Sequence, residues 1–407
     1  MTGRPPIDRP QPPPAPSRRR VLTALGVAGL ASVVETTPLL AQLAADTCPD
    51  AGPAGTLVRT LPLYGGRGPR PTPFGQIVGR PGLDARRFTD LSQVDADRLV
   101  TPTPHVFVRT TAPAALGARP MPWTIPVAGL VESPSALAAA SLIARAQPMG
   151  VHLMECAGNS DPQNFGLMSA VAWSGVPLAD VVTAARPTPA ATGVLVTGVD
   201  DEAEAWRSQP GASWVLPLAD LAGLGAFLAT EMNGAPLPLD HGAPVRLVVP
   251  GWYGCAWIKW VDGIQLVDAE APATSQMHEF AARTHQPAAP GRAREYAAPE
   301  IDLAATPIRV EQRLVEGRTA YRIVGLVWGG AATVERLQIR FGVQEEWQPM
   351  RLCPTPATHH TWSLWEHTWR PAAPGVYGIV LRADDRAIRT RRLDMSYYIR
   401  LVRIDAV

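Results

Sequence analysis

Hydrophobic and polar residues follow two different patterns along this chain of 407 residues. Between residues 104 and 267, short β-branched runs predict strands at 105–109, 123–127, 151–155, 194–199, 244–249 and 257–260. Stretches rich in Ala and Leu predict helices at 135–146, 178–185 and 218–230. Strands and helices in irregular order favour an α+β domain over a doubly wound sheet.

The pattern changes after residue 270. A Pro/Ala linker at 287–290 precedes strand-like runs separated by Gly, Pro or Asp about every 10 residues, as in an antiparallel sandwich. These runs cover 308–315, 319–328, 333–341, 376–382 and 396–403. We therefore expect one domain at 46–284 and a second at 285–407. The Pro/Gly-rich residues 57–100 are read as extended chain that wraps a domain.

The first 45 residues have the pattern of an export signal. A proline-rich start leads into Ser17-Arg18-Arg19-Arg20-Val21-Leu22 and an uncharged run that ends at Val34. Paired arginines before apolar residues are typical of a twin-arginine signal. An ordinary secretory signal and a buried helix are the alternatives, and the lack of a clean Ala-x-Ala site leaves open an uncleaved N-terminal anchor. We therefore expect a periplasmic or other extracytoplasmic protein.

Charge and motif content exclude several classes of protein. The 37 Lys and Arg nearly balance the 36 Asp and Glu, which argues against a nucleic-acid partner because such binding needs a field of one sign. No G-x-G-x-x-G or P-loop opens a predicted helix, so no dinucleotide or nucleoside triphosphate site of the standard kind is expected. Lys259 is the single lysine of the chain, so a chemical need for an ammonium group is plausible at this position.

The four cysteines are Cys48, Cys156, Cys255 and Cys353. No two of them form a C-x-x-C pair, which excludes the common zinc, thioredoxin-like and c-type haem motifs. In an oxidising compartment they could form one or two disulfides. Cys156 stands apart because it ends a predicted strand before the small-residue turn Ala-Gly-Asn, where a thiol can serve as a metal ligand or a nucleophile. No His and Asn partners of a cysteine protease are found locally, which weakens the nucleophile reading.

A second candidate segment contains His241, Arg246 and Lys259. These residues place three potential donors on a strand and its flanking loops, which suits an anionic group such as a phosphate. Taken singly, each would be read as a solvated or capping residue. Together with the bias that leaves one lysine in the chain, they favour a chemical role for Lys259.

These segments resemble the sulfite oxidase family of molybdenum enzymes. The resemblance rests on Cys-Ala-Gly-Asn at 156–159, on Glu-Met-Asn-Gly-x-Pro-Leu-Pro-x-Asp-His-Gly-x-Pro-Val-Arg-x-Val-Val-Pro-Gly at 231–251, and on Ile-Lys-Trp at 258–260. It covers residues 100–280 closely and the C-terminal part loosely. It implies a molybdopterin-binding domain of the sulfite oxidase type followed by an all-β immunoglobulin-like sandwich of the dimerisation type. The implied cofactor is molybdenum-molybdopterin, and no haem is expected in this chain.

The resemblance also assigns roles to residues of this chain. Cys156 matches the thiolate ligand of molybdenum, and Arg109 matches an arginine that faces both cofactor and substrate. The matched cofactor-binding positions are Phe107, Val108, Arg109, Thr110, Thr111, Asp200, His241, Arg246, Trp257, Ile258 and Lys259. Thr110 and Thr111 stand where the family usually has Asn-His, so contacts there would use backbone groups. The matched substrate pocket consists of Arg109, Trp173, Phe280 and Trp365.

Several positions depart from the sulfite enzymes of the family. Ser160 and Asp161 replace a pair of arginines, Phe280 replaces a tyrosine, and Trp365 replaces a further arginine. Because an oxyanion is best held by several converging cations, these changes predict weaker binding of sulfite.

The resemblance implies oxygen-atom transfer at molybdenum, with electrons passed to an external carrier such as a c-type cytochrome or a quinol-linked subunit. One alternative is reduction of a neutral S-oxide or N-oxide at the same site. The alternative of another class is a cofactor-free exported binding or scaffold protein.

Overall fold

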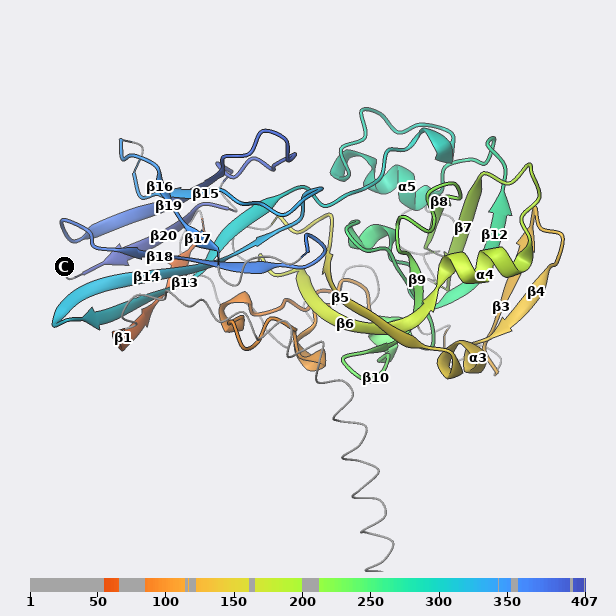
Figure 1. The fold of residues 1–407 in the computed structure, drawn as a ribbon, viewed down its shortest axis with the longest axis horizontal. Coiled ribbons are helices and arrows are strands. Elements are labelled where there is room, and N and C mark those ends of the chain that lie inside the picture. Colours follow the sequence, from red (N-terminus) through yellow and green to blue (C-terminus); the bar gives the residue numbers. More distant parts are fainter. Residues whose placement is uncertain are drawn as a thin grey trace, which may run out of the picture. The chain divides into compact units, whose positions relative to one another are not determined.

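The computed structural model describes residues 55–65, 85–113, 116, 122–160, 165–199, 212–342, 344–352, 358–395, 398–405 and 407. The export signal, Asp161, Asp200, Cys48 and Cys353 lie outside these residues. Four five-stranded sheets form most of the described fold, and its helices are short (Figure 1). The architecture is therefore rich in β-structure, with few helices.

The first sheet has the strand order β4-β3-β12-β7-β8. Its strands are β3 (Thr124–Gly129), β4 (Ser135–Ala138), β7 (Gly193–Gly198), β8 (Ser213–Pro217) and β12 (Val261–Val267). Strand β12 runs parallel to β3 and antiparallel to β7. Its buried residues include Val261, Ile264 and Leu266. Because β12 follows the Lys259 segment directly, this sheet anchors one wall of the site described below.

The second sheet is antiparallel and has the order β10-β9-β6-β5, with β11 also paired to β9. Its strands are β5 (Gln147–Glu155), β6 (Met168–Pro177), β9 (Phe227–Met232), β10 (Ala235–Pro236) and β11 (Arg246–Val248). Two short helices, α3 (Ala139–Ala144) and α4 (Leu178–Ala185), pack against β6 and β9. Strand β5 is exposed where it begins and buried at its last three residues, so it carries Cys156 into the interior.

The remaining two sheets combine the C-terminal segment with strands from the N-terminal side. One has the order β1-β13-β14-β18-β17 and the other β16-β15-β19-β20-β2. Their strands are β1 (Thr56–Leu61), β2 (Leu63–Tyr64), β13 (Ala304–Val315), β14 (Arg318–Trp328), β15 (Leu337–Arg340), β16 (Gln348–Pro349), β17 (Arg351–Leu352), β18 (Ser363–Trp369), β19 (Gly375–Ala383) and β20 (Arg400–Ile404).

An aromatic cluster joins these two sheets. Trp369 on β18 stacks on Phe341 at a centroid distance of 4.0 Å, and Tyr377 on β19 meets Trp369 edge-on at 4.7 Å. Rings of this size bury large apolar areas, so the cluster contributes strongly to packing between the sheets. The residues at 56–64, read as wrapping chain, provide the edge strands β1 and β2.

Four predicted elements differ from the structure. Residues 105–109 contain no strand, because the prolines around them favour the short 3-10 helix η2 (Thr103–His105) followed by an isolated bridge at Val108. Residues 135–146 divide into β4 and α3. Residues 218–230 form turns that lead into β9, whose buried residues pair with β6 and β11. Residues 257–260 form a loop, since Trp260 turns the backbone to a φ of 50°.

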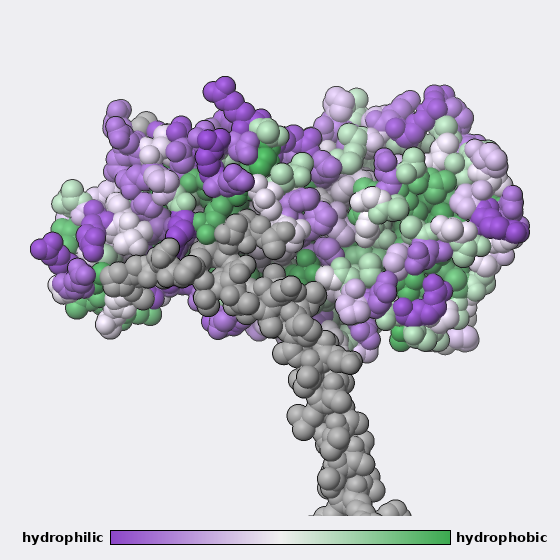
Figure 2. Space-filling model, in the orientation of Figure 1, coloured by the Kyte–Doolittle hydropathy of each residue, from purple (hydrophilic) through white to green (hydrophobic). Residues whose placement is uncertain are grey.

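Polar side chains cover most of the face drawn in Figure 2, and hydrophobic ones gather there in small groups. The exposed large apolar residues include Leu57, Val58 and Leu314, which lie on the paired strands β1 and β13. Within the described part of the chain, no helix has the length and apolar character that a bilayer crossing requires.

Candidate active site

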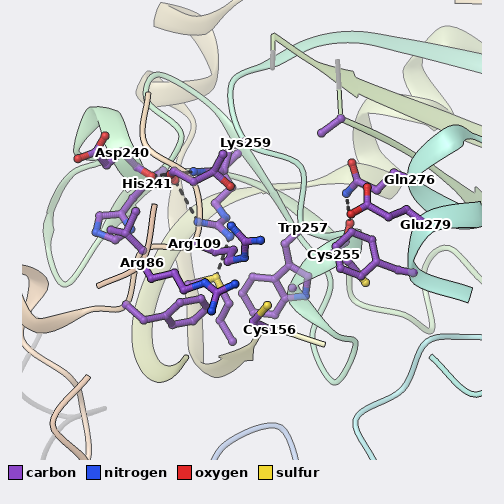
Figure 3. Close-up of a pocket in the computed structure, with 18 of the residues that line it drawn as sticks. Arg86, Arg109, Cys156, Asp240, His241, Cys255, Trp257, Lys259, Gln276 and Glu279 are labelled. Atoms are coloured by element: carbon purple, nitrogen blue, oxygen red, sulfur yellow. Dashed lines mark hydrogen bonds between the residues drawn. The ribbon is translucent and has the colours of Figure 1, made fainter. Parts of the chain in front are cut away.

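A cavity of about 480 Å³ collects most of the predicted site residues. Its lining consists of Arg86, Phe107, Val108, Arg109, Thr110, Met154, Cys156, Ala212, Asp240, His241, Arg246, Gly254, Cys255, Trp257, Lys259, Gln276, Glu279, Phe280 and Arg283. In Figure 3, Arg86, Arg109 and Lys259 lie on one side, Gln276 and Glu279 on the other, and Cys156 and Trp257 between them. Positive side chains therefore gather on one side of the cavity, the basic side, whereas the segment that carries Gln276 and Glu279 also carries the cationic Arg283.

Cys156 follows β5 directly and is 8% exposed. Its sulfur accepts a hydrogen bond from the backbone N–H of Gly158 at 3.4 Å. Burial raises the pKa of the thiol, whereas this N–H and the positive charges of Arg109 and Arg283 act in the opposite direction. A bound cation would favour the thiolate further, so the position suits a metal ligand.

Alternation along β5 places neighbouring side chains in different surroundings. Met154 and Cys156 face the cavity, whereas Glu155 between them is fully buried against the C-terminal segment. The Glu155 carboxylate accepts hydrogen bonds from Arg391 at 2.6 and 2.9 Å and from the indole N–H of Trp328 at 2.8 Å. The strand that delivers Cys156 is therefore held from behind by a buried ion pair.

Lys259 and Arg246 supply positive charge to the basic side of the cavity. The Lys259 ammonium donates to the carbonyl oxygens of Thr110 at 2.5 Å and Asp240 at 3.0 Å, and lies 4.2 Å from the centroid of the Trp260 ring. The Arg246 guanidinium donates to the His241 carbonyl oxygen at 3.2 Å and to the Met154 sulfur at 2.7 Å. These contacts hold both cations at the cavity wall.

His241 ends the 3-10 helix η4 (Leu239–His241) and is 2% exposed. Burial, together with the charges of Arg246, Lys259 and Arg87, lowers the pKa of its imidazole from 6.5 to about 3. The ring is therefore neutral near pH 7, and its Nε2 lies 3.4 Å from the guanidinium of Arg87. This geometry allows Arg87 to donate to Nε2 while Nδ1 carries the proton.

The structure brings together most, but not all, of the predicted residues. Those that line the cavity are Phe107, Val108, Arg109, Thr110, Cys156, His241, Arg246, Trp257, Lys259 and Phe280. Thr111 and Ile258 are not among the lining residues, and Ile258 is 1% exposed in the core. Asp200 lies outside the described residues.

The two remaining tryptophans of the predicted substrate pocket do not line the cavity. Trp173, on β6, is 2% exposed and meets Trp257 edge-on at 5.9 Å, so it supports the wall from behind. Trp365 is a correction to the prediction: it is fully buried on β18, opposite Gly325, and donates from its indole N–H to the Leu326 carbonyl oxygen at 3.0 Å. It packs within a C-terminal sheet because glycine at position 325 leaves room for the indole.

Several lining residues were missed by the sequence analysis. They are Arg86, Met154, Ala212, Asp240, Gly254, Cys255, Gln276, Glu279 and Arg283. Four lining residues at 276, 279, 280 and 283 have the i, i+3, i+4, i+7 spacing of one helix face, a signal that the sequence did contain. Cys255 is a free, buried thiol, as is Cys156, which removes Cys255 from the candidate disulfides.

The residues present fit a molybdenum-pterin group. The cavity volume lies within the range of about 300–1,000 Å³ typical of cofactor sites. One wall offers a soft sulfur ligand, and another offers an ammonium and a guanidinium for an anionic tail. The buried indole N–H of Trp173 has no hydrogen-bond partner among the described residues, so a polar group remains available beside the wall.

Comparisons with known proteins agree with this chemistry. Residues 112–275 match the family described as oxidoreductase molybdopterin binding domain. Sulfite oxidase of Gallus gallus is 28% identical over 319 residues, which are 71% of this chain and 67% of that protein. The catalytic subunit of protein-methionine-sulfoxide reductase from Gluconobacter oxydans is 32% identical over 163 residues, 38% of this chain and 50% of that protein.

A solved structure shows the same fold. The sulfane dehydrogenase SoxCD from Paracoccus pantotrophus matches with a TM-score of 0.62 and 19% identity, over 88% of this chain and 95% of that chain. The match extends well beyond residues 112–275 into the C-terminal sheets. From the cavity, the cysteine and these similarities together, we conclude that the chain carries a molybdopterin-binding oxidoreductase domain similar to that of the sulfite oxidase family.

Proposed function

We propose that this chain oxidises a small sulfur oxyanion such as sulfite by two-electron oxygen-atom transfer. The observation that carries the proposal is one cavity with the Cys156 thiol on one wall and Lys259, Arg246 and His241 on another. A metal ligand and a receptor for an anionic cofactor tail are thereby placed on different walls of one molecule-sized space.

The protein residues divide the work of binding and orientation. When bound, the molybdenum-molybdopterin group supplies the two-electron redox couple and the transferable oxygen atom. Cys156 holds the metal, and Lys259 and Arg246 hold the anionic tail by charge-assisted hydrogen bonds. Neutral His241 offers a hydrogen bond without adding charge. Arg109 orients the substrate and stabilises negative charge that develops on its oxygen atoms.

In the oxidative direction the substrate gains one oxygen atom that derives from water, and two protons and two electrons leave. The protons pass to solvent. The electrons pass to an external one-electron carrier such as a c-type cytochrome, in two successive transfers.

Reduction of an S-oxide is the second candidate. It is favoured by the aromatic side chain of Phe280 in the cavity and by the resemblance to a methionine-sulfoxide reductase subunit. In that direction the same atoms move in reverse, so the substrate loses one oxygen atom as water while two electrons and two protons enter. The charge of the preferred substrate separates the two candidates.

We further propose export and a two-domain organisation. The paired arginines at positions 18–20 support a twin-arginine signal within residues 1–45, and so a periplasmic or extracytoplasmic enzyme. Two sheets packed through Trp369 support an immunoglobulin-like sandwich at 285–407, which would serve dimerisation, after a molybdopterin-binding domain at 46–284.

The test is made on protein produced in a host that synthesises molybdopterin. We expect one molybdenum per chain and sulfite-dependent reduction of ferricyanide. Cys156→Ser should abolish the activity and leave the fold intact, and Cys255→Ser, which changes the other thiol of the cavity, should keep its molybdenum. Absence of molybdenum from the wild-type protein would favour a cofactor-free binding protein, and full activity of Cys156→Ser would disprove the ligand assignment.

A further inference from the structure

One face of a short helical segment forms the outer side of the cavity. Helix α5 (Ser275–Phe280) continues into the 3-10 helix η6 (Ala281–Arg283). The Thr274 hydroxyl caps the start of α5 by accepting from the Met277 N–H at 3.2 Å, and the Met277 side chain is buried. The Gln276 side chain donates to the Cys255 carbonyl oxygen. These contacts fix the rotation of the segment and direct its other face into the cavity.

Arg283 is the last residue of that face. A methyl group built on Gly158 would lie 3.5 Å from its Nη1 and 3.7 Å from the Cys156 sulfur, so guanidinium and thiol share one small space. The positive charge of Arg283 also acts on the Cys156 thiol, as does that of Arg109. Two guanidinium groups therefore act on the position at which the thiol ligand is placed.

The Arg283 guanidinium is held by an aromatic ring rather than by an acid. It lies 5.5 Å from the centroid of the Phe280 ring, a cation–π contact. Glu279, four residues earlier on the same face, is suitably spaced for a helical ion pair. The described residues nevertheless provide no ion-pair or hydrogen-bond partner for Arg283. Its donors are therefore available to a ligand.

We propose that Arg283 is a specificity-determining residue that binds a negatively charged oxygen of the substrate, opposite Arg109. This inference rests on the proposed function. Arg283 would supply positive charge in place of the arginines that are absent at 160 and 161, and it comes from a different element of the fold. Glu279 on the same face has the opposite effect, because its charge disfavours an anion in the cavity.

The test compares two residues of one helix face. In the molybdenum-loaded enzyme, Arg283→Gln should raise the KM for sulfite about 10- to 100-fold, because a charge-assisted hydrogen bond is lost. Arg283→Lys should recover part of this loss, and Glu279→Gln should lower the KM. The control is Arg294→Gln, which removes an exposed arginine paired with Glu270 at 3.2 Å outside the cavity.

A sulfite KM within twofold of wild type for Arg283→Gln would overturn the proposal, as would equal losses in Arg283→Gln and Glu279→Gln. Calorimetric titration with sodium sulfate, at constant ionic strength, keeps the proposal testable if sulfite is not oxidised. Weaker sulfate binding by Arg283→Gln alone would then support an anion site without sulfite oxidation. Equal binding by both proteins would reject the anion site itself.

Discussion

The ion pair between Glu155 and Arg391 allows a sharp prediction about stability. Glu155 precedes the thiol ligand, has no exposed surface, and forms hydrogen bonds with Arg391, Trp328 and Asn159. The Arg391 side chain is 11% exposed and also donates to the Tyr398 hydroxyl at 3.0 Å. Both charges are therefore removed from water and depend on each other.

Arg391→Met removes the positive charge and keeps a long apolar side chain. The carboxylate of Glu155 is then left buried without its partner, so we expect a loss of about 3–5 kcal/mol in the free energy of unfolding. Glu155→Gln should cost a comparable amount, since it leaves the guanidinium unpaired. The double variant should lose less than the sum of the two by about 1–3 kcal/mol, because it leaves neither charge alone.

Urea denaturation followed by tryptophan fluorescence measures these differences in the free energy of unfolding. The proteins are compared where the dependence of that free energy on urea concentration has the same slope. The matched control is Arg392→Met in the next position. Its partner Asp394 lies at 2.7 Å, but the two side chains are 75% and 58% exposed, so a loss of at most about 1 kcal/mol is expected. Equal losses for Arg391→Met and Arg392→Met would refute the reasoning. Molybdenum content should fall only in the Arg391 and Glu155 variants, since they loosen the strand end that carries Cys156.

Two further predictions concern His241 and Gly325. The pKa of the His241 imidazole is about 3 in the folded protein and 6.5 in the unfolded chain. Between these pH values only the unfolded chain binds a proton at this imidazole, so the stability of the fold falls as the pH falls below 6.5. For cofactor-free protein we expect the free energy of unfolding to fall by about 2 kcal/mol from pH 6.5 to 5, and this fall should be absent in His241→Gln. Identical pH profiles of the two proteins in urea titrations would refute this prediction. Gly325→Ala should lower the free energy of unfolding by about 1–3 kcal/mol, because the added methyl group would overlap the Trp365 ring. Thermal or urea unfolding measures this change. A variant as stable as the wild type would show that the sheet adapts to the methyl group.

The local part of the site could be predicted from the sequence. Cys156 follows a strand whose apolar pattern and small-residue turn are continuous in the chain, and the structure has β5 ending at Glu155. The groups around Lys259 and His241 are also close in sequence and meet in one cavity. In both cases the chemistry and the backbone signal lie within a few residues of each other.

The rest depends on contacts between distant segments. Residues 227–232 have no strong local preference for a strand, and β9 forms because β6 and β11 pair with it on either side. The family resemblance assigned Trp365 to the pocket, but its position is decided by the space above Gly325. Arg283 lies beside Gly158 and Cys156 because the segment that carries it is fixed in rotation by contacts of α5 with Thr274 and Cys255. The spacing of positions 276, 279, 280 and 283 in the sequence indicates a common helical face, but it does not indicate that this face lines the cavity beside Cys156.

The edge strands β1 and β2 have a consequence for biosynthesis. Arg59 on β1 forms a hydrogen bond with Gln312 on β13, 253 positions later, and Leu63 on β2 pairs with Val402 on β20. At roughly 5–20 residues per second, a ribosome takes roughly 10–50 s to reach the partner of β1. Strands β1 and β2 therefore acquire their sheet partners only long after they have been synthesised. Formation of these two sheets is thus a late step in the folding of the chain.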